Sequence, residues 1–179
     1  MNGLRVTLAL ASAVLAWPAR AAERKFDVCS VLTAREIEAV QGDRVTATKA
    51  SEPERVRFAV SQCFYTLATF SKSVSLEVTR PDPDHAGEGP RDQWIKLFQR
   101  AAGSEAGGER ENQRRKKASK PQRVAGVGDE AFWIQTGPGG ALYVLKNNAY
   151  IRISVGGAHE GSVKLEKSKA LAKKAVKRL

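Results

Sequence analysis

The clearest alternation of apolar and polar residues in this chain lies between positions 132 and 155. In its last segment the two alternating sets are Ile151, Ile153 and Val155, and Tyr150, Arg152 and Ser154. A period of two is typical of a strand with one face buried and the other exposed. Turn residues at 136–140 and at 147–148 divide the stretch. It therefore predicts three consecutive antiparallel strands, with one buried face and one face available for contacts.

The first half of the chain shows the same alternation less regularly. Segments 44–48 and 55–65 fit strands, and segment 74–79 has the most regular pattern of this half. Pro81 ends the last of them, because proline cannot extend the hydrogen-bond ladder. This half therefore predicts a second group of three strands.

Helical signals flank both strand groups. A capping box, a hydrophobic staple and a glycine stop predict a first helix ending near residue 40. Those signals are carried by Leu32, Thr33, Glu36, Ile37 and Gly42. A second helix is predicted to begin at Pro90, with an apolar stripe formed by Trp94, Leu97, Phe98, Ala101 and Ala102. The stripe of a last helix is formed by Leu171, Ala172, Ala175, Val176 and Leu179. The lysines expected on its other faces are Lys169, Lys173, Lys174 and Lys177.

The order of these elements is helix, three strands, helix, three strands, helix. It predicts an α+β fold: an antiparallel sheet of about six strands in two three-strand units, packed by three helices. The two units are alike in plan, as a duplicated module would be.

The first 21 residues have the three-part organisation of a secretory signal peptide. A basic start precedes an apolar run over 6–17, and small residues at 19 and 21 fit cleavage before Ala22. The run is too short to span a membrane, which takes about 20 residues, and an uncleaved N-terminal anchor is the alternative. We expect an exported protein, periplasmic or secreted, with one domain over 22–179 and no transmembrane segment after cleavage.

The chain has two cysteines, Cys29 and Cys63. In an exported protein an even number of cysteines favours a disulfide, and closing a loop of this length stabilises a fold by about 3–4 kcal/mol. A lipid-anchoring cysteine and a metal-binding pair are the alternatives. The residues before Cys29 are not the small ones of a lipoprotein signal, and two cysteines are too few for a structural zinc site.

Positive charge is concentrated in two segments of the chain. The formal net charge is +11, and segments 109–123 and 162–179 each contain seven basic residues against two and one acidic residues. Segment 104–123 is predicted to be a mobile basic loop. Its candidate anion-binding residues are Arg110, Arg114, Arg115, Lys116, Lys117, Lys120 and Arg123. They suit an anionic polymer or lipid surface, but no aromatics interleave with them, so dedicated nucleic-acid binding is not predicted. A solvated loop is the alternative.

Several short motifs together resemble a known family. They are Cys29-Ser30, Leu32-Thr33, Glu36-Ile37, Ser61, Cys63, Tyr65, the run 127–132 and Leu171-Ala172. The set resembles bacterial cell-envelope domains of unknown function found in actinobacterial secreted lipoproteins and in the extracellular sensor regions of receptor kinases. The resemblance implies a PsbP-like sandwich with a Cys29–Cys63 disulfide, and it implies no catalytic residues. The chain departs from the lipoprotein members because it lacks their lipid-attachment cysteine and has a more basic middle loop.

Two local patterns have the spacing or the composition of a chemical site. Gly126, Gly128 and Ala131 match the spacing of a dinucleotide-binding loop, but that motif requires a strand before it and a helix after it. A strand-like segment follows here, so we predict an ordinary turn. Asp82, Asp84 and His85 could hold a cation weakly, although such a group more often only solvates a turn.

No nucleophile with an adjacent base is evident, and no cofactor or metal site is predicted. The main hypothesis is a non-catalytic exported envelope domain that binds a partner or ligand, an envelope component of unknown identity. The alternatives are an electrostatic module for anionic polymers or membrane surface and, third, a small metal-dependent hydrolase.

Overall fold

The structure is a computed structural model that describes residues 26–51, 54–55, 57–99 and 120–179. The predicted signal peptide, 1–21, lies outside the described residues, as does most of the predicted basic loop.

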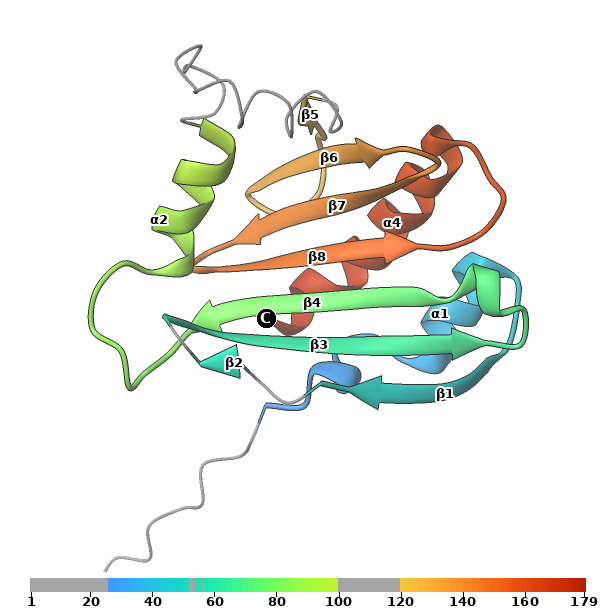
Figure 1. The fold of residues 1–179 in the computed structure, drawn as a ribbon, viewed down its shortest axis with the longest axis horizontal. Helices are drawn as coiled ribbons and strands as arrows, with labels where there is room; N and C mark the ends of the chain where they lie inside the picture. Colours follow the sequence, from blue (N-terminus) through green and yellow to red (C-terminus); the bar gives the residue numbers. More distant parts are fainter. Residues whose placement is uncertain (1–25, 52–53, 56, 100–119) are drawn as a thin grey trace, which may run out of the picture.

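Within the described ranges, an eight-stranded antiparallel sheet forms the centre of the molecule (Figure 1). Its strands are β1 (Val45–Ala50), β2 (Glu54–Arg55), β3 (Phe58–Leu67), β4 (Val74–Pro81), β5 (Gln122–Arg123), β6 (Glu130–Thr136), β7 (Gly139–Lys146) and β8 (Ala149–Val155). The order is β1-β3-β4-β8-β7-β6-β5, and β2 pairs with β3 beside β1. The six longer strands form the two predicted three-strand units, which meet where β4 pairs with β8. The predicted α+β class is therefore confirmed, and β2 and β5 are short additions at the edges.

Helices lie on both faces of this sheet (Figure 1). α1 (Ala34–Gln41) and α4 (Gly161–Ala175) contact each other and share one face, and α2 (Pro90–Trp94) covers part of the other. α2 continues as a π-helical turn, η3 (Ile95–Gln99). The 3-10 turns are η1 (Val28–Ser30), η2 (Phe70–Lys72) and η4 (Val176–Arg178). The three helices predicted from the sequence are thus present.

The capping box and the glycine stop predicted for α1 are both present. The Thr33 hydroxyl accepts a hydrogen bond from the Glu36 amide at 3.3 Å, and the Glu36 carboxylate accepts one from the Thr33 amide at 2.9 Å. Gly42 ends the helix with a φ of 64°, a value that glycine adopts without strain. Arg178 of η4 donates to the same carboxylate at 2.9 Å, so the last turn of the chain is attached to the first turn of α1.

The main core lies between the sheet and the helices α1 and α4. Its fully buried side chains include Ile37, Leu76, Ile151, Ile153 and Leu171. The strand residues among them are the apolar set of the predicted alternation, which confirms the buried face. The last predicted stripe is confirmed as well, because all five of its members pack into this core.

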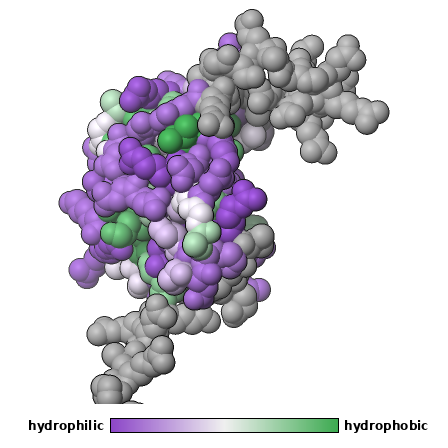
Figure 2. Space-filling model, turned by 90° about the vertical axis from the view of Figure 1, so that its left-hand side faces the viewer, coloured by the Kyte–Doolittle hydropathy of each residue, from purple (hydrophilic) through white to green (hydrophobic). Residues whose placement is uncertain are grey.

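A second, smaller core corrects one prediction about the opposite face. Tyr150 was expected to lie on an available face, but it is 6 % exposed and packs with Trp94, Phe98 and Leu145. α2 therefore covers that end of the sheet. Figure 2 views the molecule from this end, where the described surface is mostly hydrophilic with small, separate hydrophobic patches.

The predicted stripe of α2 is partly wrong. Trp94 and Phe98 are buried, but Leu97 is 44 % exposed, because the π turn widens the helix and rotates this residue away from the sheet. Ala101 and Ala102, the other members of the stripe, lie outside the described residues.

Candidate functional site

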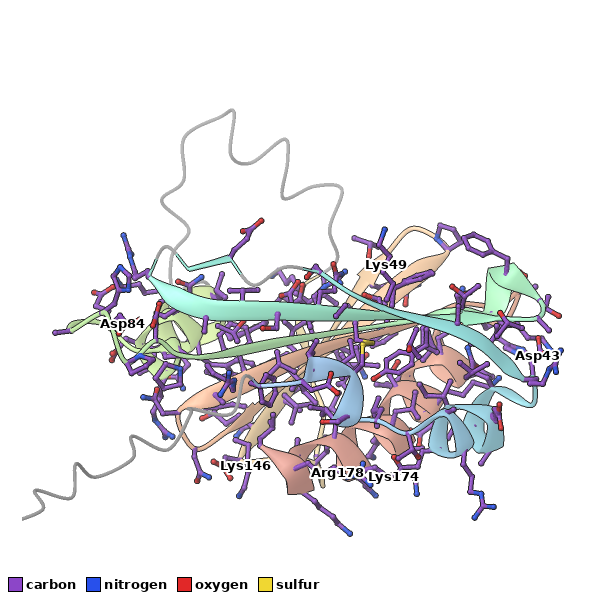
Figure 3. All side chains as sticks on the ribbon, turned by 90° about the horizontal axis from the view of Figure 1, so that it is seen from below. Asp43, Lys49, Asp84, Lys146, Lys174 and Arg178 are labelled. Atoms are coloured by element: carbon purple, nitrogen blue, oxygen red, sulfur yellow. A yellow bond between two sulfur atoms is a disulfide. The ribbon has the colours of Figure 1, made fainter. Side chains whose placement is uncertain are left out.

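The two cysteines form a disulfide, as predicted (Figure 3). Their Cα atoms are 5.2 Å apart, and the bond joins η1 to the middle of β3. Tyr65 lies close by and donates from its hydroxyl to the carbonyl oxygens of Cys29 and Leu32 at 3.1 and 3.2 Å. Burial raises the pKa of Tyr65 to about 12. Both sulfur atoms are used in the bond, so neither is available for a lipid or a metal.

The predicted anion-binding residues are only partly described. Lys120 and Arg123 are exposed, and Arg123 belongs to β5 at the edge of the sheet. The other five, Arg110, Arg114, Arg115, Lys116 and Lys117, lie outside the described residues. Anion binding by this segment stays a prediction.

The structure divides the lysines of the second basic segment into two groups. Lys173, Lys174 and Lys177 are exposed, as expected, whereas Lys164 is only 7 % exposed. Lys167 is half-buried, and its ammonium donates to the side-chain oxygen of Gln41 at 3.1 Å. Burial, and then the nearby charge of Lys72, lower the pKa of Lys167.

Asp82, Asp84 and His85 come together in the turn after β4. One oxygen of the buried Asp82 carboxylate accepts from the Asp84 amide at 3.2 Å, and the other lies 3.1 Å from Nδ1 of His85. These contacts shape the turn itself. Within the described ranges, no three or more His, Cys, Asp or Glu side chains are arranged to hold a metal ion.

The glycines before β6 form a turn, as predicted. A strand rather than a helix follows them, so the helix required by a dinucleotide site is absent at this position. Gly128 has a φ of 61°, and a Cβ there would lie 2.5 Å from the carbonyl oxygen of Leu145. Only glycine allows this close approach to β7.

The sheet face opposite α1 and α4 carries a group of half-buried side chains, which we call the open face. Its members are Gln62, Phe64, Ser75, Glu77, Tyr143, Arg152 and Ser154. In the described part of the chain, η3 covers Tyr143, whose ring centroid lies 5.4 Å from that of Phe98, and no helix covers the other six. Arg152 donates from Nε to the Tyr143 hydroxyl at 3.1 Å. Lys49 of the edge strand β1 projects to the same side (Figure 3).

An aromatic pair lies at one end of the open face. Phe70, in η2, is 70 % exposed, and its ring centroid is 6.2 Å from that of Phe64. Beside Phe64 the surface is hollowed into a pocket of about 530 Å³, which we call the Lys164 pocket. Among its lining residues are five hydroxyl side chains and one ammonium group, and the described lining includes no carboxylate.

Close packing at a glycine brings the walls of this pocket together. A Cβ at Gly156 would lie 2.1 Å from the carbonyl oxygen of Ser71, so only glycine lets the end of β8 approach the η2 turn this closely. The Gly156 amide donates to the Ser73 carbonyl at 2.9 Å. The buried side chain of Gln41 then donates to the carbonyls of Lys72 and Gly156 and attaches α1 to both segments.

Lys164 supplies the positive charge of the pocket. It lies in the first turn of α4, and its ammonium donates to the carbonyl oxygen of Pro138, another lining residue, at 2.7 Å. An ammonium has three donors, and within the described residues this carbonyl is its sole acceptor. Its other donors can therefore bond to water or to a ligand that enters the pocket.

Three of the four serine hydroxyls that line the pocket differ in their hydrogen bonds. Ser73 accepts from the Leu67 amide at 3.3 Å, and Ser75 accepts from the Gln62 side chain at 3.0 Å. A hydroxyl that accepts still has its own proton to donate. Ser154 instead donates to the Gly140 carbonyl at 2.9 Å and keeps its lone pairs. The pocket can therefore offer donors and an acceptor to a bound molecule.

Sequence reasoning missed Lys164 because it treated the lysines of its segment as the solvated side of the last helix. One signal was available: Lys164 and Ser168 continue the spacing of Leu171 and Ala175 toward the start of the helix. That places Lys164 on the buried side. The period of two predicts the correct face for Ser154, but its position opposite Ser75 depends on strand pairing.

The fold and the site define a disulfide-linked α+β sandwich with an open, polar sheet face that ends in a cationic pocket. Comparison with protein-family models and with curated proteins gave no significant match. None of the helices in the described ranges has the length and apolarity needed to cross a membrane.

Proposed function

We propose that this protein is a non-catalytic, exported domain of the cell envelope that binds an envelope component through the open face and its adjoining loops. The observation that carries the proposal is the open face itself. Apart from Tyr143, which packs against Phe98 of η3, its half-buried aromatic, charged and hydroxyl side chains extend over β3, β4 and β8 without a covering helix in the described part of the chain.

The composition of the open face is suited to binding an envelope component. Arg152 belongs to a residue type that is enriched in binding interfaces, and Phe64 and Phe70 add adjacent aromatic surface. Isolated exposed apolar residues are common on proteins, but here the aromatic pair adjoins both the polar face and the pocket.

Export is supported by two features. The first 21 residues follow the plan of a signal peptide, and disulfides such as Cys29–Cys63 persist in oxidising compartments. The resemblance to bacterial envelope domains agrees with this location, either periplasmic or outside the cell.

The open face can be tested by site-specific photo-crosslinking in cells that export the protein. Glu77, at the centre of the face, is replaced by p-benzoylphenylalanine. The matched control places the same group at Lys174, which is exposed on the helical side of the sheet (Figure 3). We expect a light-dependent adduct with an envelope component from position 77 and none from position 174. Equal labelling from both positions, or none from position 77, would contradict the proposal.

The second candidate function is electrostatic binding to an anionic polymer or membrane surface. It is favoured by the surplus of five positive charges over 109–123 and by the exposure of Lys120 and Arg123. Deletion of 109–123 separates the two candidates. Salt-sensitive binding to heparin or to anionic vesicles is lost only if this segment is the binding element, whereas crosslinking from position 77 persists if the open face binds.

A further inference from the structure

The Lys164 pocket contains a positive charge that its own walls do not balance. Lys164 is more than nine-tenths buried and donates to a single neutral carbonyl in the described residues. No carboxylate lies among the described lining residues. An anionic group in the pocket would accept the remaining ammonium donors as charge-assisted hydrogen bonds, the stronger kind.

The other lining residues indicate the chemistry of the rest of the ligand that carries this anionic group. Ser73 and Ser75 have hydroxyl protons to donate, and Ser154 has lone pairs that can accept from a ligand hydroxyl. Phe64 adds an apolar wall against which the C–H face of a ring can pack. The volume of about 530 Å³ lies within the range of small-molecule sites.

We propose that the Lys164 pocket binds a small hydroxylated carboxylate with the chemistry of a sugar acid. One ammonium matches the single charge of a carboxylate, whereas a phosphate dianion is more often held by arginine forks or by several cations. The hydroxyl-rich lining matches the rest of such a ligand. The inference rests on the proposed binding function, because Phe64, Ser75 and Ser154 belong to both the open face and the pocket.

The first test is an NMR titration of the purified exported protein with galacturonate and, separately, with galactose, which has the same ring without the carboxylate. We expect galacturonate to shift the amide signals of Gly139, Gly156 and Gly157, and to bind at least about tenfold more tightly than galactose, the factor expected for a hydrogen bond to a charged group. Equal affinities, or shifts that do not include these glycines, would overturn the proposal.

The second test removes the charge while keeping most of the length of the side chain. Lys164→Met is expected to weaken galacturonate binding at least about tenfold, while Lys174→Met, on the same helix but exposed, leaves it within about twofold. Ser75→Ala removes one hydroxyl donor without touching Lys164 and is expected to weaken binding about threefold. It serves as the deciding variant if Lys164→Met does not fold. Equal affinity of all variants would show that the pocket is not the site.

The experiments distinguish failure of the ligand assignment for the Lys164 pocket from failure of the binding function proposed for the open face. Loss of galacturonate binding with crosslinking from position 77 intact would overturn the ligand assignment alone. Galacturonate binding at the expected glycines without any adduct from position 77 would instead support the pocket and contradict recognition of a partner by the open face.

Discussion

At the scale of single residues, the ion pair between Glu36 and Arg178 joins the first turn of α1 to the last turn of the chain. The Arg178 guanidinium lowers the pKa of Glu36 from 4.5 to about 2, assisted by the Thr33 cap. A carboxyl group with a lowered folded-state pKa stabilises the fold above its unfolded pKa, and the stabilisation is lost as the pH falls through the folded value. The contribution of Glu36 is therefore present at neutral pH and disappears between about pH 5 and pH 2.

Glu36→Gln is accordingly expected to lower the free energy of unfolding by about 1–3 kcal/mol at pH 7 and to have little effect near pH 2. The lower part of this range allows for solvent screening, because the Arg178 side chain is 40 % exposed. Urea unfolding at pH 7, 4 and 2.5 measures the difference. Glu166→Gln, an exposed change on α4, is the control and should stay near wild type at each pH. A Glu36→Gln effect that does not change with pH would contradict the assignment.

The residues of the α1 cap could be predicted from the sequence because their partners lie three to five positions apart. Thr33, Glu36 and Gly42 act through the backbone of their own helix, so local spacing determines their geometry. Lys164 is different. Its surroundings come from the β6–β7 turn, the end of β8 and the η2 turn, segments that only strand pairing brings together. Local sequence spacing therefore predicts the capping signals, whereas it does not predict the pocket.

At the scale of elements, α2 shows that the apolar periodicity of a sequence does not predict the exposure of each side chain. The apolar spacing correctly predicted a helix against the sheet, but it assumed a uniform α-helical turn. The π turn over Ile95–Gln99 keeps Trp94 and Phe98 in contact, with ring centroids 4.4 Å apart, and turns Leu97 outward. The same packing buries Tyr150. The alternation in β8 therefore predicts correctly which sheet face each side chain lies on, but not how exposed the side chain is. A period assigns side chains to faces, and only the packed helix decides which part of a face is covered.

Trp94 is expected to attach α2 to the sheet. It is fully buried, its ring centroid is 5.8 Å from that of Tyr150, and its indole N–H donates to Glu130 at 3.0 Å. Trp94→Ala should lower the free energy of unfolding by about 3–5 kcal/mol, the range for truncating a large core aromatic. Leu97→Ala, three positions along the chain and exposed, should change it by less than about 0.5 kcal/mol. Chemical denaturation of both variants measures the contrast, and similar losses would show that the π turn is wrongly placed.

At the scale of the whole molecule, the disulfide joins the segment before α1 to a strand in the sheet. The β1 edge strand and α1 both lie within the closed loop, whose ends are separated by 34 positions. Cross-linking these positions removes conformations mainly from the unfolded chain. Tyr65 supports the same junction in the folded state, because its hydroxyl donates to the carbonyl of Cys29 within η1 and to that of Leu32 just after it. The first three-strand unit is therefore the part of the fold that depends most on oxidation.

Replacing both Cys29 and Cys63 by serine is expected to lower the free energy of unfolding by about 3–4 kcal/mol, the chain-entropy value for a loop of this length. Urea titration of the double variant and of the wild type with and without reductant measures this loss. The reduced wild type should unfold near the urea concentration of the variant, because both lack the same constraint. Titration of the unreduced protein under denaturing conditions should detect no thiol. Two free thiols, or an unchanged midpoint on reduction, would show that the bond is not formed in the mature protein. Folding in an oxidising compartment would then be supported by the first 21 residues alone.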